Sequence, residues 1–428
     1  MSQLTTNRRQ FLGVLGATSV ALGHGSALCA GEEKGAEPSA PQSVFLSPCV
    51  LQNPTENSIS VVWLVPAPAT GWVEWGTSPD NLDQRATGSV LGLNPYDDLV
   101  IAIRIKNLQP NTRYYYRAAS ALVDFKYAYS IKQREPEYTE VRSFTTPGKN
   151  AEAASFSVIN DTHEYQDVLA EVLAKVDDLG ADYTVWNGDL VHYINQVETI
   201  RNAIFHPAGR AFAQENPLLF VRGNHDARGT WVRNLPRFLP TWKHENIQFD
   251  ALGYNFAVRK GDLALIGLDT GEDKPDFRRE WGGLADFEQH IALQREWLEY
   301  IMETDAVKTA PFVVAFCHIP LFDANPKANP GTLETGFSAW KKLGADLWGP
   351  ALKRYNVQLV VAAHTHVFRV DAPTEERPWT QIVGGGCRPE QIPTVIHGVV
   401  REGKLHVDAH DVFGKKILAS LDFEPRFH

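Results

Sequence analysis

Residues 218–226 read Leu-Leu-Phe-Val-Arg-Gly-Asn-His-Asp. The apolar run at the start of this stretch leads through an arginine and a glycine to three side chains that can bind a metal ion or a phosphate group. Short apolar runs of this kind are typical of parallel strands buried on both faces. Because ligand sites in such sheets collect at the carboxyl ends of strands, the stretch predicts an α/β sheet with a functional site at this strand's tip.

The same arrangement occurs at four more places. Apolar runs end in metal-capable side chains at residues 159–163, 186–189, 316–318 and 362–366, which read Ile-Asn-Asp-Thr-His, Trp-Asn-Gly-Asp, Phe-Cys-His and Ala-Ala-His-Thr-His. Each one alone has an ordinary explanation, since an Asp or Asn at a strand end often caps a helix and Gly-Asp is a common turn. Five such ends in one chain indicate a shared site.

The residue types suit two transition-metal ions. Carboxylate oxygens, an amide oxygen and imidazole nitrogens form a mixed donor set, and one carboxylate can bridge two ions. Residues i and i+2 of a strand lie on the same side, so Asp161 can converge with His163, and His364 with His366. Two ions about 3.5 to 4 Å apart clamp an in-line displacement at phosphorus. These residue types therefore suit a pair of transition-metal ions, iron, manganese or zinc, that act at phosphorus.

Strands and helices alternate from residue 154 onward, which indicates an α/β domain over 154–428. We expect strands at 155–159, 183–186, 218–221, 254–258, 263–268, 312–316, 358–362, 381–383, 395–400 and 406–412, and helices at 166–179, 285–304 and 343–355. Two polar insertions rich in Gly and Pro, 271–283 and 322–336, are predicted to form lids over a site.

The preceding residues, 43–147, have the pattern of a β-sandwich. Short strands rich in β-branched and aromatic residues are expected at 58–64, 71–75, 100–105, 112–118 and 141–145, and the polar segment 132–140 is expected to be a loop. Leu108-Gln-Pro-Asn-Thr-Arg-Tyr114 resembles the corner of fibronectin type III domains in which the Tyr hydroxyl closes a turn. A domain of this kind precedes the catalytic domain of purple acid phosphatases. Residues 147–154 are expected to link the two domains.

The order of the strand-end motifs resembles the calcineurin-like metallophosphoesterase superfamily over about residues 154–412. That resemblance implies a four-layer α/β/β/α sandwich of two mixed sheets. It also implies one ion on Asp161, His163, Asp189 and His366, and a second on Asp189, Asn224, His318 and His364, with Asp189 as the bridge. His225 would contact the phosphoryl oxygen and stabilise charge or protonate the leaving group. The nucleophile would be a metal-bound hydroxide, with no covalent enzyme intermediate.

Two positions depart from the purple acid phosphatases, which have Asp-x-Gly as the first motif and a tyrosine that binds ferric iron in Gly-Asp-x-x-Tyr. Here His163 replaces the glycine, and His192 follows Gly188-Asp189-Leu190-Val191, with Tyr193 one place late. We therefore predict a site of divalent ions without tyrosinate. His192 stands where many superfamily members have an Asp that orients the catalytic histidine. It is either an additional substrate contact or a solvated loop residue.

Several further residues are weaker candidates. Asn224, His192, Arg222 and Arg388 are possible substrate contacts, and for both arginines the alternative is an ordinary surface position. Trp281, Trp340 and Trp348 either line a substrate cleft or pack in the core or a lid. Asp226 is expected to orient the loop beside it.

The composition limits partners and location. With a formal net charge of −10, the chain is not expected to bind a nucleic-acid backbone, which usually meets a basic face. The four cysteines do not suggest a disulfide framework. Arg8-Arg9 followed by the apolar run 13–22 resembles a twin-arginine export signal, so we expect a signal peptide over 1–30, a linker over 31–42 and a periplasmic or extracellular protein. No run reaches the ~18 apolar residues of a membrane span.

The sequence thus predicts an exported binuclear phosphoesterase that acts on a small phosphorylated substrate. Phosphomonoesters are the first choice, and phosphodiesters are the alternative at the same site. An extracellular binding or adhesion protein with a degenerate metal site is the alternative of another class, although the complete set of ligand residues weighs against it. Substrate identity and oligomeric state stay open.

Overall fold

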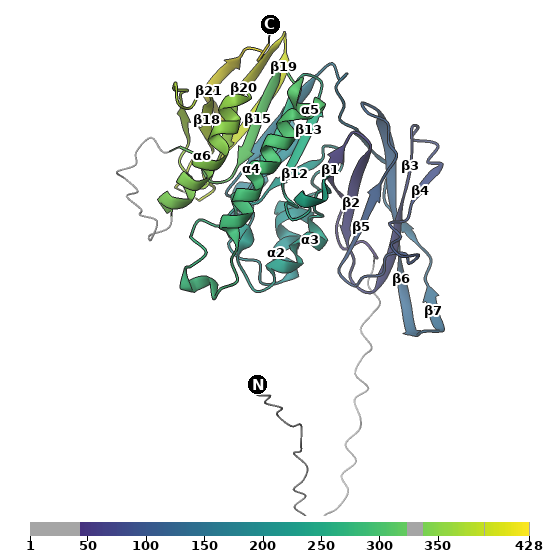
Figure 1. The fold of residues 1–428 in the computed structure, drawn as a ribbon. Helices are drawn as coiled ribbons and strands as arrows, with labels where there is room; N and C mark the ends of the chain where they lie inside the picture. The colour runs from purple at the N-terminus through teal and green to yellow at the C-terminus, as the bar shows by residue number, and fades with distance from the viewer. Residues whose placement is uncertain (1–42, 323–336, 389, 428) are drawn as a thin grey trace, which may run out of the picture. The chain divides into compact units, whose positions relative to one another are not determined.

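The computed structural model describes residues 43–322, 337–388 and 390–427 (Figure 1). The predicted signal peptide and linker, and nearly all of the predicted insertion 322–336, lie outside these residues. A β-sandwich is followed along the chain by an α/β domain, as the sequence predicts. None of the described helices is long and apolar enough to cross a membrane.

The sandwich packs two sheets around an apolar core. One sheet consists of β1 (Val50–Thr55), β2 (Ser58–Leu64) and β5 (Val100–Ile105). The other has the order β4 (Gln84–Ala86), β3 (Ala69–Gly76), β6 (Arg113–Tyr127), β7 (Ser130–Gln133). Strands β8 (Glu137–Tyr138) and β9 (Arg142–Thr145) also pair with β6. Trp63, Tyr116 and Phe144 are among its core residues. The Tyr114 hydroxyl accepts a hydrogen bond of 2.9 Å from the Gln109 amide, which is the expected corner.

The expected loop at 132–140 is wrong in part. The strand expected at 112–118 continues to Tyr127 and turns into β7, with Phe125 opposite Ile131, and β8 pairs with β6 as well. The side chains of this hairpin are largely exposed on both faces. The alternation of apolar and polar residues that marks a half-buried strand is therefore missing from the sequence.

The α/β domain contains two mixed sheets. The first runs β21 (Lys416–Phe423), β20 (Lys404–Asp411), β19 (Thr394–Arg401), β10 (Ala154–Ile159), β11 (Tyr183–Asn187), β12 (Leu218–Val221). The second runs β13 (Phe256–Lys260), β14 (Leu263–Leu268), β15 (Phe312–Cys317), β16 (Leu359–Ala362), β18 (Thr380–Val383), β17 (Arg369–Asp371). Strands β10–β12 are parallel, and so are β14, β15, β16 and β18, which brings their carboxyl ends to one edge in each sheet.

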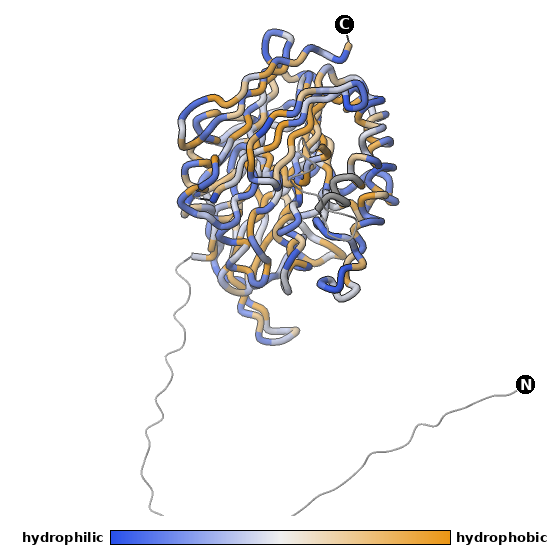
Figure 2. Tube along the Cα trace, turned by 90° about the vertical axis from the view of Figure 1, so that its left-hand side faces the viewer, coloured by the Kyte–Doolittle hydropathy of each residue, from blue (hydrophilic) through white to orange (hydrophobic). Residues whose placement is uncertain are grey.

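The layers form because each sheet is apolar on both faces. Phe156 and Val185 of the first sheet and Val314 and Phe316 of the second belong to one core cluster between the sheets. Helix α1 (Gln166–Leu179) covers the outer face of the first sheet, while α4 (Phe287–Glu303) and α6 (Phe337–Arg354) cover the second. The four-layer arrangement is confirmed. In Figure 2 the hydrophobic colour follows the inner strands, and the hydrophilic colour dominates the periphery.

Shorter helices and turns complete the domain. They are α2 (Val197–Ile200), a π-helix (Arg201–Phe205), α3 (Leu235–Phe238), α5 (Asp305–Lys308), and 3₁₀ turns at Pro207–Gly209, His225–Ala227, Val232–Asn234, Ile247–Phe249 and Arg279–Trp281. Cys49, Cys317 and Cys387 are buried and unpaired.

One sheet runs through both domains, which the sequence does not predict. Strand β1 pairs in parallel with β12, with Gln52 opposite Leu218, and so extends the first sheet to nine strands. Gln52 is 2% exposed and donates a hydrogen bond of 3.0 Å to the Phe238 carbonyl. The sequence of β1, Val-Leu-Gln-Asn-Pro-Thr, lacks the alternation typical of a strand. Its polar side chains Gln52 and Asn53 instead donate hydrogen bonds to backbone carbonyls of the α/β domain.

The hydroxyl of Tyr116 provides a test of this boundary. It donates a hydrogen bond of 2.7 Å to the Gln214 carbonyl in the α/β domain, and Tyr116 is 1% exposed. We expect Tyr116→Phe to lower the free energy of unfolding by about 1 kcal/mol, because the Gln214 carbonyl loses its hydrogen-bond donor. Tyr115→Phe is the control, since Tyr115 faces the other side of β6. Urea denaturation measures both, and equal costs for the two variants would contradict the expectation.

Candidate metal centre

The strand ends of both sheets meet in two groups of donor atoms. In the first group, Asp161, His163, Asp189 and His366 each offer one ligand atom, and these atoms all lie within 4.8 Å of one another. Asp189, His318 and His364 form the second group within the same limit. Asp189 belongs to both groups. The structure therefore brings together six of the seven residues that the sequence assigns to metal binding, and the seventh, Asn224, lies among them.

Distances within the first group are short. His163 Nε2 and His366 Nε2 are 3.2 Å apart, and His366 Nε2 is 3.2 Å from Asp161 Oδ1. His163 Nε2 is also 3.5 Å from Asp189 Oδ2. Nitrogen and carboxylate electron pairs thus point at one common volume.

The second group shares an oxygen with the first. Asp189 Oδ2 is 3.2 Å from His318 Nε2. Asn224 Oδ1 lies 3.1 Å from His318 Nε2 and 2.9 Å from His364 Nδ1, so the amide oxygen joins this group. One oxygen of Asp189 consequently faces both groups, as a bridging ligand requires.

Unusual backbone conformations turn these side chains inward. Five of the candidate ligands have positive φ, with values of 48° at Asp161, 43° at His163, 53° at Asp189, 67° at His364 and 58° at His366. Non-glycine residues rarely adopt this left-handed region, and where they do they concentrate at functional sites. Gly223 is needed for close approach, because a Cβ there would lie 2.4 Å from Asp189 Oδ1.

Buried hydrogen bonds fix the loops that carry the donors. The Asp226 carboxylate accepts hydrogen bonds from the amides of Asp189, Leu190 and Gly223 at 2.8, 3.0 and 2.9 Å. Asp226 therefore orients the loop, as expected. Burial and the nearby charge of Asp189 raise the pKa of Asp226 to about 7, while hydrogen bonds from the Gly223 and Asp189 amides act in the opposite direction.

The histidines are oriented from behind. His318 Nδ1 donates to the Asn187 carbonyl at 2.8 Å, so its Nε2 faces the centre. His366 Nδ1 lies within 3.1 to 3.2 Å of the Gln391 amide group. Contacts of this kind set the tautomer of a metal-binding imidazole.

The buried negative charge of the two aspartates suits this site to binding a cation. Asp161 and Asp189 are almost fully buried, and His366 Nε2, which lies 3.2 Å from Asp161 Oδ1, is itself a candidate ligand. Burial lowers the pKa of His163 to about 3 and that of His364 to about 4. Both imidazoles are therefore neutral and can donate an electron pair to a metal ion. Burial also acts to lower the pKa of His318, but the charges of Asp189 and Asp161 outweigh it and raise that pKa to about 10. The site thus demands positive charge.

His225 lies beside the donor groups rather than within either one. Its backbone N–H donates to Asp189 Oδ1 at 2.9 Å, and its Nδ1 donates to the His192 carbonyl at 2.9 Å. Its Nε2 accepts from Arg228 Nη1 at 3.1 Å. Arg228 in turn donates to Glu272 at 2.6 Å and to Asp273 at 2.9 Å. A neutral His225 and a fixed guanidinium therefore stand together at the edge of the centre.

His192 packs against the centre. Its ring stacks on the His163 ring, with centroids 4.6 Å apart and planes at 19°, and it is half-buried. His163, His192 and His225 also form a third group of donor atoms within 4.8 Å. Tyr193, in contrast, is 54% exposed, and its ring centroid is 6.0 Å from that of His225.

The weaker candidates from the sequence lie in different environments. Arg222 forms an ion pair of 2.8 Å with buried Asp269, so an ordinary surface position is wrong for it. Arg388 is exposed. Trp348 is buried in the core, Trp281 from the predicted lid 271–283 lines a pocket next to His225, and the side chain of Trp340 lies outside the described residues.

Two contributors were missed by the sequence interpretation. Arg228 follows His225 by three residues across a 3₁₀ turn, a spacing that brings side chains together and was available as a signal. Gln391 has no such signal, because its position depends on the path of the chain after Gly386.

Comparisons with known proteins agree with this geometry. The sequence model for calcineurin-like phosphoesterases matches residues 154–368, about half of the chain, and that for the purple acid phosphatase N-terminal domain matches residues 41–146. Probable purple acid phosphatase 20 of Arabidopsis thaliana is 25% identical over 348 residues, which cover 78% of this chain and 69% of that protein. Purple acid phosphatase 22 of the same plant is 23% identical over 314 residues, 69% of this chain and 60% of that protein.

A solved structure shows the same fold. Purple acid phosphatase PPD1 from yellow lupin (Lupinus luteus) seeds superimposes with a TM-score of 0.64 at 14% identity, covering 88% of this chain and 74% of its own. Both domains are thus matched by sequence models, and their arrangement has a counterpart of known structure. The chain belongs to the calcineurin-like phosphoesterase family and is a metal-dependent phosphoesterase with a purple acid phosphatase N-terminal domain.

Proposed function

We propose that this protein hydrolyses phosphomonoesters with two divalent transition-metal ions, iron, manganese or zinc. The observation that carries the proposal is the pair of buried donor groups that share Asp189. A shared carboxylate between two sets of nitrogen and oxygen donors is the arrangement that binuclear phosphoester hydrolysis needs. The names of the similar Arabidopsis proteins, all purple acid phosphatases, support a monoester substrate.

The ligands follow from the two groups. One ion would be held by Asp161, His163, Asp189 and His366, and the other by Asp189, Asn224, His318 and His364. When bound, the ions supply Lewis-acid activation of the phosphoryl group and of the attacking water. The hydrogen bond from His364 N to Asp161 Oδ2, at 2.9 Å, holds a ligand of one group against a ligand of the other.

His225 acts on the substrate. The hydrogen bond from Nδ1 to the His192 carbonyl keeps Nε2 turned toward the site, where, once protonated, it donates a hydrogen bond to a phosphoryl oxygen or gives a proton to the leaving oxygen. Arg228, 3.1 Å from Nε2, adds a second donor at the same point. Asn224, one residue before His225, is the remaining substrate contact in this proposal, and His192 contributes through its carbonyl.

Export is part of the same proposal. The twin-arginine pattern at Arg8-Arg9 supports export and a periplasmic or extracellular location.

A substrate panel with metal quantification tests the function. Protein purified without chelator is expected to contain close to two equivalents of transition metal per chain and to hydrolyse phosphomonoesters faster than phosphodiesters. Faster hydrolysis of diesters would assign the same site to a phosphodiesterase. Absence of metal, together with no turnover after manganese is added, would contradict the proposal.

Two variants separate metal binding from catalysis. Asp189→Asn is expected to deplete both ions, because it weakens the shared ligand. His225→Ala is expected to keep both ions and to lose roughly 10²-fold or more in kcat, the scale of one transition-state donor. Elemental analysis and kinetics measure the two effects, and His206→Ala, at an exposed position, is the control. Loss of metal in His225→Ala would contradict the role given to His225.

The visible absorption spectrum tests whether a tyrosinate binds iron. Because Tyr193 is largely exposed and its place in the purple acid phosphatase motif is taken by His192, the iron-loaded protein is expected to show no tyrosinate charge-transfer band. The visible spectra of the wild type and Tyr193→Phe should coincide. A band that disappears in Tyr193→Phe would show that tyrosine binds iron.

A further inference from the structure

A pocket of about 650 Å³ adjoins the metal centre. This volume falls within the usual range for small-molecule sites, about 300 to 1,000 Å³. Two lining residues connect it with His225. Arg228 contacts His225 Nε2 at 3.1 Å, and the Tyr193 ring lies 6.0 Å from the His225 ring. The pocket therefore lies beside His225, on the side of Arg228 and Tyr193.

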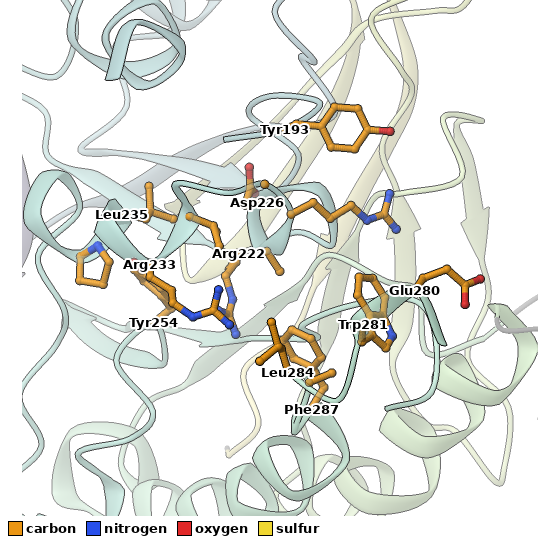
Figure 3. Close-up of a pocket in the computed structure, with 16 residues that line it drawn as sticks. Tyr193, Arg222, Asp226, Arg233, Leu235, Tyr254, Glu280, Trp281, Leu284 and Phe287 are labelled. Carbon is orange, nitrogen blue, oxygen red and sulfur yellow. The ribbon is translucent and has the colours of Figure 1, made fainter. Parts of the chain in front are cut away.

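Aromatic rings form much of the wall. Figure 3 shows Trp281, Leu284 and Phe287 on one side of the pocket and Tyr193 across from them. Between Tyr254 and Phe287 lies the Arg222 guanidinium, whose central carbon is 5.5 Å from the first ring and 5.7 Å from the second. Planar surfaces of this kind favour a planar guest, because offset stacking and edge contacts add to the area that is buried.

The charges at the pocket are largely balanced. Arg222 is paired with Asp269 at 2.8 Å, and Arg228 is paired with Asp273 at 2.9 Å and also with Glu272. Three further acidic or basic residues line it: Arg233 and Glu280, which are exposed and have opposite sign, and the buried Asp226. A second phosphate would therefore find no excess of positive charge in the interior, which favours an uncharged occupant.

From these contacts we infer that the pocket binds the alcohol part of the substrate, and that this part is an uncharged aromatic group. The inference rests on the proposed phosphomonoesterase function and names the substrate class. The predicted lid thereby gains a role, since Trp281 belongs to the insertion 271–283 and selects the leaving group.

Matched esters test the inference. Ethyl phosphate and 2-phenylethyl phosphate are both esters of primary alcohols, so their leaving groups have similar acidity and differ mainly in the ring. The wild type is expected to show a kcat/KM for the phenylethyl ester that is about 10-fold higher or more. Trp281→Ala should lower that ratio by about 5- to 10-fold, the scale of one aromatic contact. Leu284→Ser should also lower the ratio of the two kcat/KM values. Leu284 is exposed, so this substitution does not endanger folding.

The control variant is Phe277→Ala. Phe277 lies in the same insertion, is 69% exposed and does not line the pocket, so its loss should leave the ratio unchanged. Equal kcat/KM values for the two esters in the wild type would overturn the inference and leave the phosphatase proposal standing. A ratio unchanged in Trp281→Ala and Leu284→Ser would overturn it as well.

Calorimetry separates this inference from the proposed function. Benzylphosphonate and methylphosphonate carry the same anionic group and cannot be hydrolysed, so their affinities for the metal-loaded protein report the pocket without turnover. Tighter binding of benzylphosphonate, reduced in Trp281→Ala, is the expected result. If neither ester is hydrolysed, the substrate panel with metal quantification decides the proposed function, and the two phosphonates alone decide whether the pocket accepts an aromatic group. Equal phosphonate affinities would then overturn the inference too.

Discussion

The carboxylate of Asp189 is the group on which the rest of the site depends. It is 1% exposed, its Oδ2 lies 3.2 Å from His318 Nε2, and its Oδ1 accepts the His225 amide at 2.9 Å. A buried charge without compensation costs several kcal/mol, so the fold must supply partners or a cation. The donor groups on either side of Asp189 supply such partners and can also hold a cation. The stability of the site is therefore linked to metal binding.

The two sheets are locked to each other at the same point. Asn187, the last residue of β11 in the first sheet, is fully buried, and its side-chain amide donates to the carbonyls of Cys317 and Val361 in the second, at 3.2 Å each. His318 returns a hydrogen bond to the Asn187 carbonyl. Because Asn187 lies two residues before Asp189, a shift of one sheet relative to the other would separate the ligands that each sheet provides.

The donors could be predicted because they are local. Asp161, Asp189 and His318 each lie within two residues of the end of a buried strand, and parallel strands bring such ends to one edge whatever the loops do. The helix at 166–179 was predicted with its observed bounds for a similar reason, since its apolar spacing lies within the segment itself. The continuous sheet and the Gln391 contact depend on pairings far apart in the sequence, and neither leaves a periodic signal. The exposed β6–β7 hairpin was missed because its burial does not alternate.

The shared sheet gives the sandwich a physical connection to catalysis. Strand β12 leads directly to Asn224 and His225, and without β1 it would be the edge of the first sheet, with unpaired backbone groups along one side. Gln52 of β1 also holds the Phe238 carbonyl at the end of α3, whose first residue, Leu235, lines the aromatic pocket. The sandwich thus supports both the strand that leads to His225, the proposed catalytic residue, and one wall of the pocket. Removing it would expose β12 and loosen that wall, although no sandwich residue is among the metal-binding candidates.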